Sequence, residues 1–296
     1  MSDAFRLKLQ ENSKRIGSLL DDLLFNQFCH SGEYRIEGLI SAIRYATLNG
    51  GKRLRSFLVV ECAALFGFNG PAVLHVGAAI ECVHCYSLIH DDLPAMDDGH
   101  IRRGKPTVHI EYDEATAILA GNSLLTYAFE IIFSPEIELK DGIRSDLALL
   151  LARSAGLDGM LGGQMLDMQE EFLDETSIFT LLGMKTGALM RFSCEAGAII
   201  AGVGNDERIR LRNFGENLGI IFQLADDLLD LDNCQKNLEK ISIKNATSKK
   251  NSFVRLKGSD WIKKEITRRT VETLKILECY GQKAQSLREL TNFLSY

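Results

Sequence analysis

Apolar side chains recur at spacings of three and four residues along most of this 296-residue chain. Such spacing places them on one face of an α-helix, which is then buried against its neighbours. The chain contains only four prolines, and because proline breaks the interior of a helix, long helices are possible. No segment shows the alternation of a half-buried strand. The sequence therefore predicts an all-α fold, and we expect residues 1–296 to form a single domain.

Glycine-containing breaks divide the periodic stretches into predicted helices. These cover residues 3–28, 35–48, 53–66, 71–91, 113–132, 143–157, 159–171, 177–202, 206–231, 259–280 and 283–294. Residues 232–258 interrupt the series, because they are rich in Lys, Asn and Ser and carry no apolar stripe. They form either a solvated loop or a lid whose lysines reach phosphates. The lid is considered because long polar loops in compact domains are often functional.

The composition is that of an ordinary globular protein, with 46% hydrophobic residues, 25% charged residues and a net charge of −6. A negative charge without a long basic tract before the C-terminal third disfavours nucleic acid as a partner. The sequence has no uncharged apolar run of about 18 residues, so we expect no membrane span. The N-terminal residues lack the uninterrupted apolar core of a signal peptide.

The seven cysteines lie mostly in apolar segments. An odd, scattered set is typical of buried thiols in a reducing compartment, which predicts a cytoplasmic location. Cys82, His84 and Cys85 resemble half of a zinc site. However, no second Cys/His pair stands at the spacing that a tetrahedral site needs, so we interpret these cysteines as core residues.

Two aspartate clusters follow predicted helices, Asp91–Asp98 (DDLPAMDD) and Asp226–Asp230 (DDLLD). Unpaired carboxylates are costly to bury, so such clusters need a cationic partner or a solvated surface. Asp226 and Asp230 share one helix face, and Pro94 should break the first helix and turn its carboxylates to one point. If the clusters faced each other, their oxygens would suit Mg²⁺, which binds a few carboxylates together with substrate phosphates.

Two basic segments accompany these acids. Gly50–Arg55 (GGKRLR) joins two predicted helices, and its glycines allow a tight turn while its cations and the next helix N-terminus favour an anion. Ile101–Thr107 (IRRGKPT) follows the first aspartate cluster closely. Its arginines either neutralise that cluster or bind the far side of a diphosphate whose near side meets Mg²⁺. The combination of acid, base and glycine in one loop favours the second interpretation.

Other polar residues interrupt predicted apolar helices. Lys185 and Thr186 stand in the middle of 177–202, where lysine is costly unless it faces a cavity. Gln223 shares a helix face with Asp226. His84 lies in the helix that ends at Asp91, where a lone histidine is more often a core residue than a ligand.

Together, the motifs resemble the trans-prenyltransferase (polyprenyl diphosphate synthase) family, most closely its bacterial farnesyl diphosphate synthase branch. They occur in the family's order over roughly residues 35–255, as GGKRLR, SLIHDDLPAMDD, RRGKPT, GGQMLD, MKTGALMRFSCEAGA and FGENLGIIFQLADDLLD. The resemblance implies an isoprenoid-synthase-type helical bundle around a central active-site cavity. It also implies a homodimer and three Mg²⁺ ions per active site. The implied reaction condenses isopentenyl diphosphate with dimethylallyl or geranyl diphosphate.

The resemblance also assigns roles to single residues. The expected metal ligands are Asp91, Asp97 and Asp226, together with Asp92 and Asp230. The diphosphate of isopentenyl diphosphate is assigned to Gly51, Lys52, Arg55, His84 and Arg103. The allylic diphosphate is assigned to Arg102 and Lys185, the carbocation to the oxygen dipoles of Thr186 and Gln223, and the lid to Lys240 and Lys250. The glycines that the family carries around these two lysines are absent from this sequence.

Product length is expected to depend on the residues just before the first aspartate cluster. Tyr86 stands five residues before Asp91 and is followed by Ser87. A tyrosine there would form the floor of an apolar tunnel, whereas a smaller residue would let the product grow. This favours farnesyl diphosphate (C15) over geranylgeranyl diphosphate (C20).

Two further readings stay open. A class I terpene cyclase shares metal-driven ionisation, but it needs no second basic site of the kind that GGKRLR and RRGKPT supply. A non-catalytic subunit of a heteromeric prenyl synthase typically loses its aspartates, and this chain retains both clusters.

Overall fold

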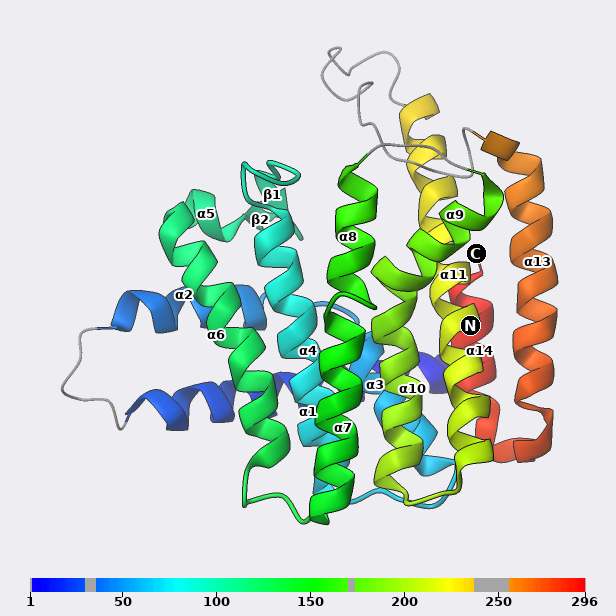
Figure 1. Cartoon of the computed structure of the whole chain (residues 1–296), viewed down its shortest axis with the longest axis horizontal. Helices are drawn as coiled ribbons and strands as arrows, with labels where there is room; N and C mark the ends of the chain where they lie inside the picture. Colours follow the sequence, from blue (N-terminus) through cyan, green and yellow to red (C-terminus); the bar gives the residue numbers. More distant parts are fainter. Residues whose placement is uncertain (1, 30–35, 170–173, 237–255, 296) are drawn as a thin grey trace. The chain divides into compact units, whose positions relative to one another are not determined.

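The computed structural model describes residues 2–29, 36–169, 174–236 and 256–295, with the backbone alone at 25–29 and 230–236. These residues are mostly helical, which confirms the all-α prediction (Figure 1). They form two compact units. The N-terminal unit contains residues 2–148 and 199–202, and the C-terminal unit contains residues 149–198 and 203–296. The single domain stays a prediction.

The N-terminal unit is built from six helices and a small hairpin, with the start of a further helix at its end. Their bounds are α1 Asp3–Cys29, α2 Glu37–Leu48, α3 Leu54–Ala64, α4 Pro71–Asp91, β1 Ile101–Arg102, β2 Lys105–Pro106, α5 Val108–Glu111 and α6 Glu114–Phe133, followed by α7 Asp141–Ala155.

The C-terminal unit takes up the rest of α7 and continues with helices of three types, α, π and 3₁₀. Their bounds are α8 Met160–Met168, α9 Glu175–Leu182, the π-helical turn η1 Gly183–Gly187, α10 Ala188–Ile200, α11 Asn205–Lys236, α13 Ser259–Ile276, the 3₁₀ segment η2 Glu278–Ala284 and α14 Gln285–Leu294.

The predicted helices agree with the structure apart from local differences. The helix predicted at 71–91 has the bounds of α4, whereas the helix predicted at 177–202 is divided by η1. The helix predicted to end at 231 continues to Lys236. The expectation of no strands was wrong for the hairpin β1–β2, whose two-residue strands are too short to show an alternating pattern.

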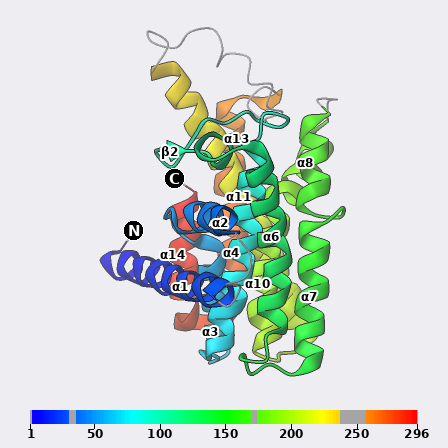
Figure 2. The same ribbon diagram turned by 90° about the vertical axis from the view of Figure 1, so that its left-hand side faces the viewer.

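α4 is the central helix of the N-terminal unit. It packs along α6 and also contacts α1, α2 and α3, and both views show α4 and α6 side by side (Figure 1 and Figure 2). Contacts on several sides explain why α4 is apolar around most of its circumference. α4 and α6 are also long and apolar enough to cross a membrane by length and composition, a test that the core helix of a soluble protein passes too. Their most apolar windows are 72% and 44% buried, respectively.

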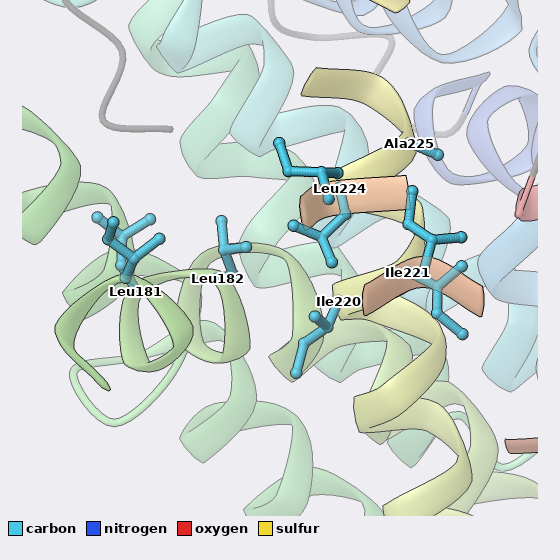
Figure 3. Packing of buried hydrophobic residues seen from close by; sticks show 9 residues of the cluster. Leu181, Leu182, Ile220, Ile221, Leu224 and Ala225 are labelled. Carbon is cyan, nitrogen blue, oxygen red and sulfur yellow. The ribbon is translucent and has the colours of Figure 1, made fainter. Parts of the chain in front are cut away.

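In the C-terminal unit, α11 is held by an apolar cluster with α9 and α13. Ile220, Ile221 and Leu224 of α11 are buried, as are Leu181 and Leu182 of α9 (Figure 3). Burying one face of α11 leaves the opposite face, at i+3 and i+4 spacing, for polar side chains. The side chains of Gln223, Asp226 and Asp227 are not buried.

Candidate active site

The hairpin β1–β2 places the two arginines of the RRGK segment. Its strands pair Ile101 with Pro106 and Arg102 with Lys105, so Arg103 and Gly104 form a two-residue turn. Both turn residues have positive φ, 53° and 76°, as a type I′ hairpin requires. Tyr45 Oη of α2 donates to the Pro106 carbonyl at 2.7 Å, which ties the hairpin to α2.

Arg102 forms a two-bond ion pair with Asp92 at the end of α4. Its Nε and Nη2 donate to Oδ2 and Oδ1 at 2.7 and 2.8 Å. The Asp92 side chain is only 7% exposed, and a Cβ at Gly99 would lie 2.7 Å from its Oδ1. Gly99 therefore makes room for this pair. The assignment of Asp92 as a metal ligand stays a prediction, and the pairing disfavours it because both carboxylate oxygens already accept from Arg102.

Asp91 and Asp97 meet at one backbone turn. α4 ends at Asp91, as Pro94 led us to expect, and the Asp97 amide then donates to the Asp91 carbonyl at 2.9 Å. The negative charges of both residues help to raise the pKa of Arg102, behind the larger effect of Asp92. The structure thus brings the backbones of Asp91 and Asp97 together at the C-terminal end of α4, close to the Arg102–Asp92 pair.

The loop between α2 and α3 has a left-handed backbone over most of its length. Gly50, Gly51 and Arg53 have φ values of 72°, 115° and 51°. Arg103 Nη1 donates to the Gly50 carbonyl at 2.7 Å, and a Cβ at Gly51 would lie 3.0 Å from the guanidinium of Arg103. Gly51 is therefore needed for its backbone conformation and because Arg103 packs against it. Lys52 is exposed on the same loop.

A buried ion pair that the sequence analysis missed anchors this loop. Arg53 Nη1 lies 3.3 Å from Glu81 Oε2, with both side chains at most 5% exposed, and Arg53 also donates to the Thr47 carbonyl. Glu81 Oε1 accepts from the Ser56 amide at 3.1 Å, so it caps the first turn of α3. A signal was present, since a glutamate within the apolar run of α4 requires a cationic partner.

His84 of α4 lies close enough to four arginines of the α2–α3 loop, α3 and the hairpin to feel their charges. Burial lowers the pKa of His84 well below its ordinary value, and the charges of Arg55, Arg103, Arg53 and Arg102 lower it further. Burial likewise lowers the pKa of Arg55 and of Arg103. Two of the four arginines are paired with carboxylates, Arg53 with Glu81 and Arg102 with Asp92. The remaining cations destabilise one another, which is the electrostatic condition for binding an anion.

A pocket of about 360 Å³ borders two of these four arginines. Its walls include Arg102 and Arg103 of the hairpin, Asp92, Leu88 of α4 and Tyr45 of α2. The guanidinium groups of Arg102 and Arg103 therefore line a pocket and are not enclosed in the protein core. The structure brings Arg55, His84 and Arg103, which were assigned to one diphosphate, close to Arg102, which was assigned to the other. Their roles stay predictions.

The depressed pKa of His84 predicts how stability depends on pH. An unfolded histidine titrates near 6.5, so between the folded pKa and that value the unfolded chain binds more protons. The free energy of unfolding therefore decreases as the pH falls below about 6.5, by up to ~1.4 kcal/mol per pH unit. We expect His84→Gln to remove this slope in chemical denaturation measured between about pH 5 and 7.

The matched control is His75→Gln, because His75 belongs to the same helix and bonds the Pro71 carbonyl, away from the arginines. Parallel stability curves for the wild type and His84→Gln over this pH range would contradict the prediction.

Tyr86 and Ser87, the predicted chain-length residues, both lie on α4. Tyr86 is 3% exposed, and burial together with the charge of Asp91 raises the pKa of its hydroxyl to about 12. Ser87 is half-buried, and its Oγ donates to the His84 carbonyl at 2.9 Å within the helix. A buried tyrosine ring close to Asp91 agrees with the proposed tunnel floor.

In the C-terminal unit, Lys185 and Thr186 lie on the π-helical turn η1. Lys185 Nζ is 2.5 Å from Asp167 Oδ2 of α8. Thr186 Oγ1 donates to Gln223 Oε1 at 2.9 Å, and Gln223 Nε2 donates to Asp227 Oδ1 at 3.1 Å. The structure thus brings together Thr186 and Gln223, as expected, and adds Asp227 as the group that orients the amide.

Glycines on two helices bring η1 into close contact with its neighbours. A Cβ at Gly163 of α8 would lie 2.3 Å from the Lys185 amide nitrogen, and one at Gly219 of α11 would lie 2.6 Å from the Cα of Gly187. Only glycine allows backbones to approach so closely. This packing fixes the turn that carries Lys185 and Thr186, and π-helical turns often occur at functional sites.

The remaining predicted residues are placed only in part. Asp226 is exposed on α11. Asp230 lies on the same helix, in the part whose side chains are not described, and Lys240 and Lys250 lie outside the described residues. Their roles stay predictions.

The described residues fit Mg²⁺ held jointly with a substrate. No group of three or more His, Cys, Asp or Glu side chains in these residues could hold a metal ion by itself. Mg²⁺, however, is usually bound by one or two carboxylates together with phosphate oxygens and water. Asp91 and Asp97, joined by a backbone hydrogen bond, would supply such a pair, and a diphosphate would supply the missing oxygens.

The N-terminal unit therefore combines two chemical features. One is a cationic group around His84 that suits a diphosphate, and the other is a carboxylate turn that suits a hard cation. In the C-terminal unit, the Thr186 hydroxyl donates its hydrogen bond to Gln223. Its oxygen lone pairs therefore have the polarity that stabilises a positive charge.

Comparisons with known proteins agree with this chemistry. The family model described as polyprenyl synthetase matches residues 37–295. Farnesyl diphosphate synthase of Micrococcus luteus is 36% identical over 94% of both chains. The chloroplastic geranylgeranyl pyrophosphate synthase of Capsicum annuum is 33% identical over 99% of this chain and 78% of its own. The crystal structure of an FPP/GFPP synthase from Zymomonas mobilis is 36% identical, covers 100% of both chains and has a TM-score of 0.89. The chain belongs to the polyprenyl synthetase family, as its motifs led us to expect.

Proposed function

We propose that this prenyltransferase condenses isopentenyl diphosphate with dimethylallyl and then geranyl diphosphate to give farnesyl diphosphate (C15). The observation that carries the chain length is the buried ring of Tyr86 on α4, five residues before Asp91. The similar proteins support the reaction class, but their names include both farnesyl and geranylgeranyl synthases.

In the proposed reaction, the C1–O bond of the allylic diphosphate breaks and the diphosphate leaves with the electron pair. The double bond of isopentenyl diphosphate attacks the allylic C1, and the new cation loses a proton, for which the departed diphosphate is the proposed acceptor. The products are inorganic diphosphate, a proton and an allylic diphosphate that is five carbons longer.

Each charged group has a defined task in this scheme. Arg55, Arg103 and Lys52 hold the diphosphate of isopentenyl diphosphate, beside the neutral ring of His84. Asp91 and Asp97, and separately Asp226, would hold Mg²⁺, which withdraws charge from the leaving diphosphate when it is bound. As the family implies, three ions are expected per active site.

The remaining residues orient the allylic substrate. Arg102 and Lys185 are cationic ligands for the allylic diphosphate, and each is already oriented by a carboxylate, Asp92 and Asp167 respectively. Thr186 offers oxygen lone pairs to the developing cation, because its hydroxyl hydrogen is engaged in the hydrogen bond that it donates to Gln223. This arrangement is electrostatic stabilisation by groups that are fixed before the reaction.

We also propose a homodimer. α6 exposes several large apolar side chains, Ile118, Leu119 and Phe133, which are 43%, 54% and 51% exposed. A second copy of the chain would remove this apolar surface from water. Sedimentation equilibrium distinguishes a dimer from a monomer directly.

The activity is tested by incubation with geranyl diphosphate, isopentenyl diphosphate and Mg²⁺. We expect release of inorganic diphosphate and a C15 product. If neither product formed, the protein would be a non-catalytic subunit. A C20 main product would overturn the proposed chain length while leaving the reaction class intact.

Removing the tyrosine ring should lengthen the product. In Tyr86→Ala, the space of the ring becomes available to the growing chain, so we expect C20 or longer products to replace C15 in chromatography of the dephosphorylated alcohols. Tyr86→Phe is the matched control, because it keeps the ring and should keep C15. An unchanged C15 product in Tyr86→Ala would remove Tyr86 from the tunnel floor.

A further inference from the structure

His90 is a half-buried histidine at the end of α4 to which the proposed reaction gives no task. It follows Tyr86 by one helical turn, and their rings meet edge to face with centroids 5.5 Å apart at an angle of 87°. Residues four apart on a helix are neighbours, and the edge-to-face arrangement is a favourable one for two aromatic rings. His90 therefore covers one side of the Tyr86 ring.

The His90 ring itself is fixed by α6. Its Nε2 lies 3.2 Å from the Ile118 carbonyl, and because a carbonyl can only accept, Nε2 carries the proton and donates. Gly121, one turn further along α6, lies directly under the ring. A Cβ at that position would stand 2.2 Å from Nε2 and 2.5 Å from Cδ2. The imidazole thus occupies space that only glycine leaves open.

Tyr86, in contrast, has no polar anchor. Its buried hydroxyl has no hydrogen-bond partner among the described residues. A buried hydroxyl usually has a hydrogen-bond partner, and such a hydrogen bond would help to fix the ring. The position of this ring therefore depends on its packing, to which His90 contributes an aromatic edge-to-face contact.

We propose that His90 is a positioning residue for product length, which holds Tyr86 in place as the tunnel floor, and that Gly121 is the residue that admits it. The inference rests on the proposed role of Tyr86 in C15 synthesis. His90 acts through Tyr86 and does not itself touch the substrate. A merely structural role for His90 would lower stability or rate but would leave the product unchanged, so product length is the decisive measurement.

The test compares His90→Ala, Tyr86→Ala and the double variant under excess isopentenyl diphosphate. Without the imidazole, the Tyr86 ring can move into the vacated space. We expect the C20:C15 ratio of His90→Ala to rise about two- to tenfold over that of the wild type. This factor corresponds to the ~0.5–1.5 kcal/mol that an aromatic pair contributes. The double variant should give the same products as Tyr86→Ala alone, because coupled residues are not additive.

Gly121→Ala provides a second test that starts from α6. The added Cβ must displace the His90 ring, so we expect the product ratio to change from that of the wild type. In a His90→Ala background the collision is absent, so Gly121→Ala should have no further effect. Gly17→Ala in α1 is the matched control, since nothing lies within 4 Å of its Cβ position. His75→Ala on α4 is the control for loss of a histidine.

The outcomes separate this inference from the proposed function. If Tyr86→Ala lengthens the product and His90→Ala does not, the role of His90 is overturned while the tunnel floor stands. If His90→Ala shifts the product additively with Tyr86→Ala, His90 does not act through Tyr86 and the inference also fails. If Tyr86→Ala leaves C15 unchanged, the tunnel floor itself is wrong. If His90→Ala does not fold, His90→Gln replaces it, because it keeps a side-chain donor and lacks the ring.

Discussion

Asp91→Asn is expected to reduce turnover by about three orders of magnitude while leaving the fold intact. A metal ion on the leaving group supplies several kcal/mol of transition-state stabilisation, and each ~1.4 kcal/mol corresponds to a factor of ten. Asn keeps the size of the side chain but loses the charge that would bind Mg²⁺. Steady-state kinetics over a range of Mg²⁺ concentrations should show a lower kcat that added metal restores only in part.

The same substitution should not destabilise the protein. Asp91 and Asp92 end α4, where the partial negative charge of a helix C-terminus disfavours carboxylates. Removing one charge should leave the free energy of unfolding unchanged or raise it by ~0.3–1 kcal/mol. Asp98→Asn is the control, because Asp98 is 60% exposed on the following turn and has no assigned metal role. Full turnover in Asp91→Asn would remove Asp91 from the metal site.

Glu81→Ala is expected to lower the free energy of unfolding by about 3–5 kcal/mol. This is the usual cost of leaving one partner of a buried ion pair without its counter-charge, and it is a large part of the roughly 5–15 kcal/mol that stabilises a typical domain. The reason is that Arg53, 5% exposed, cannot reach water, and the Ser56 amide loses its acceptor. Denaturation in urea measures the loss.

Glu61→Ala is the matched control for Glu81→Ala. Glu61 is also buried, but its partner Lys8 is 49% exposed and returns to solvent when the carboxylate is removed. The cost should therefore be clearly smaller than for Glu81. Adding Arg53→Met to Glu81→Ala should recover part of the loss, because an apolar pair replaces the stranded charge. Equal losses for Glu61→Ala and Glu81→Ala would contradict the argument.

The sequence predicted most helices because their signals are local. Apolar spacing and glycine breaks placed α4 with its observed bounds, and Pro94 correctly ended it at Asp91. Where the structure differed, the cause lies in contacts between distant segments. The hairpin at 101–106 has strands of two residues, too short for any period, and is held by Asp92 and Tyr45.

The sequence predicted which residues belong to the candidate site more fully than it predicted which residues they pair with. The sequence identified Arg55, His84 and Arg103 as one group, and they lie together. It did not reveal that Arg53 is paired with Glu81, because the two are 28 positions apart and only the packing of α3 on α4 brings them together. The pairing of Arg102 with Asp92 likewise appears only when the hairpin folds back onto α4.

The sequence by itself determined the all-α class, the helix series and the residue types of a diphosphate and metal site, because periodicity and motif order are properties of the linear chain. Tertiary structure alone decided which of these groups hold others in place. Asp92 orients Arg102, and Glu81 fixes the loop of Arg53. His90 rests against Gly121 and covers the ring of Tyr86. Such roles depend on distance and burial, which arise only when helices that are remote in sequence pack against one another.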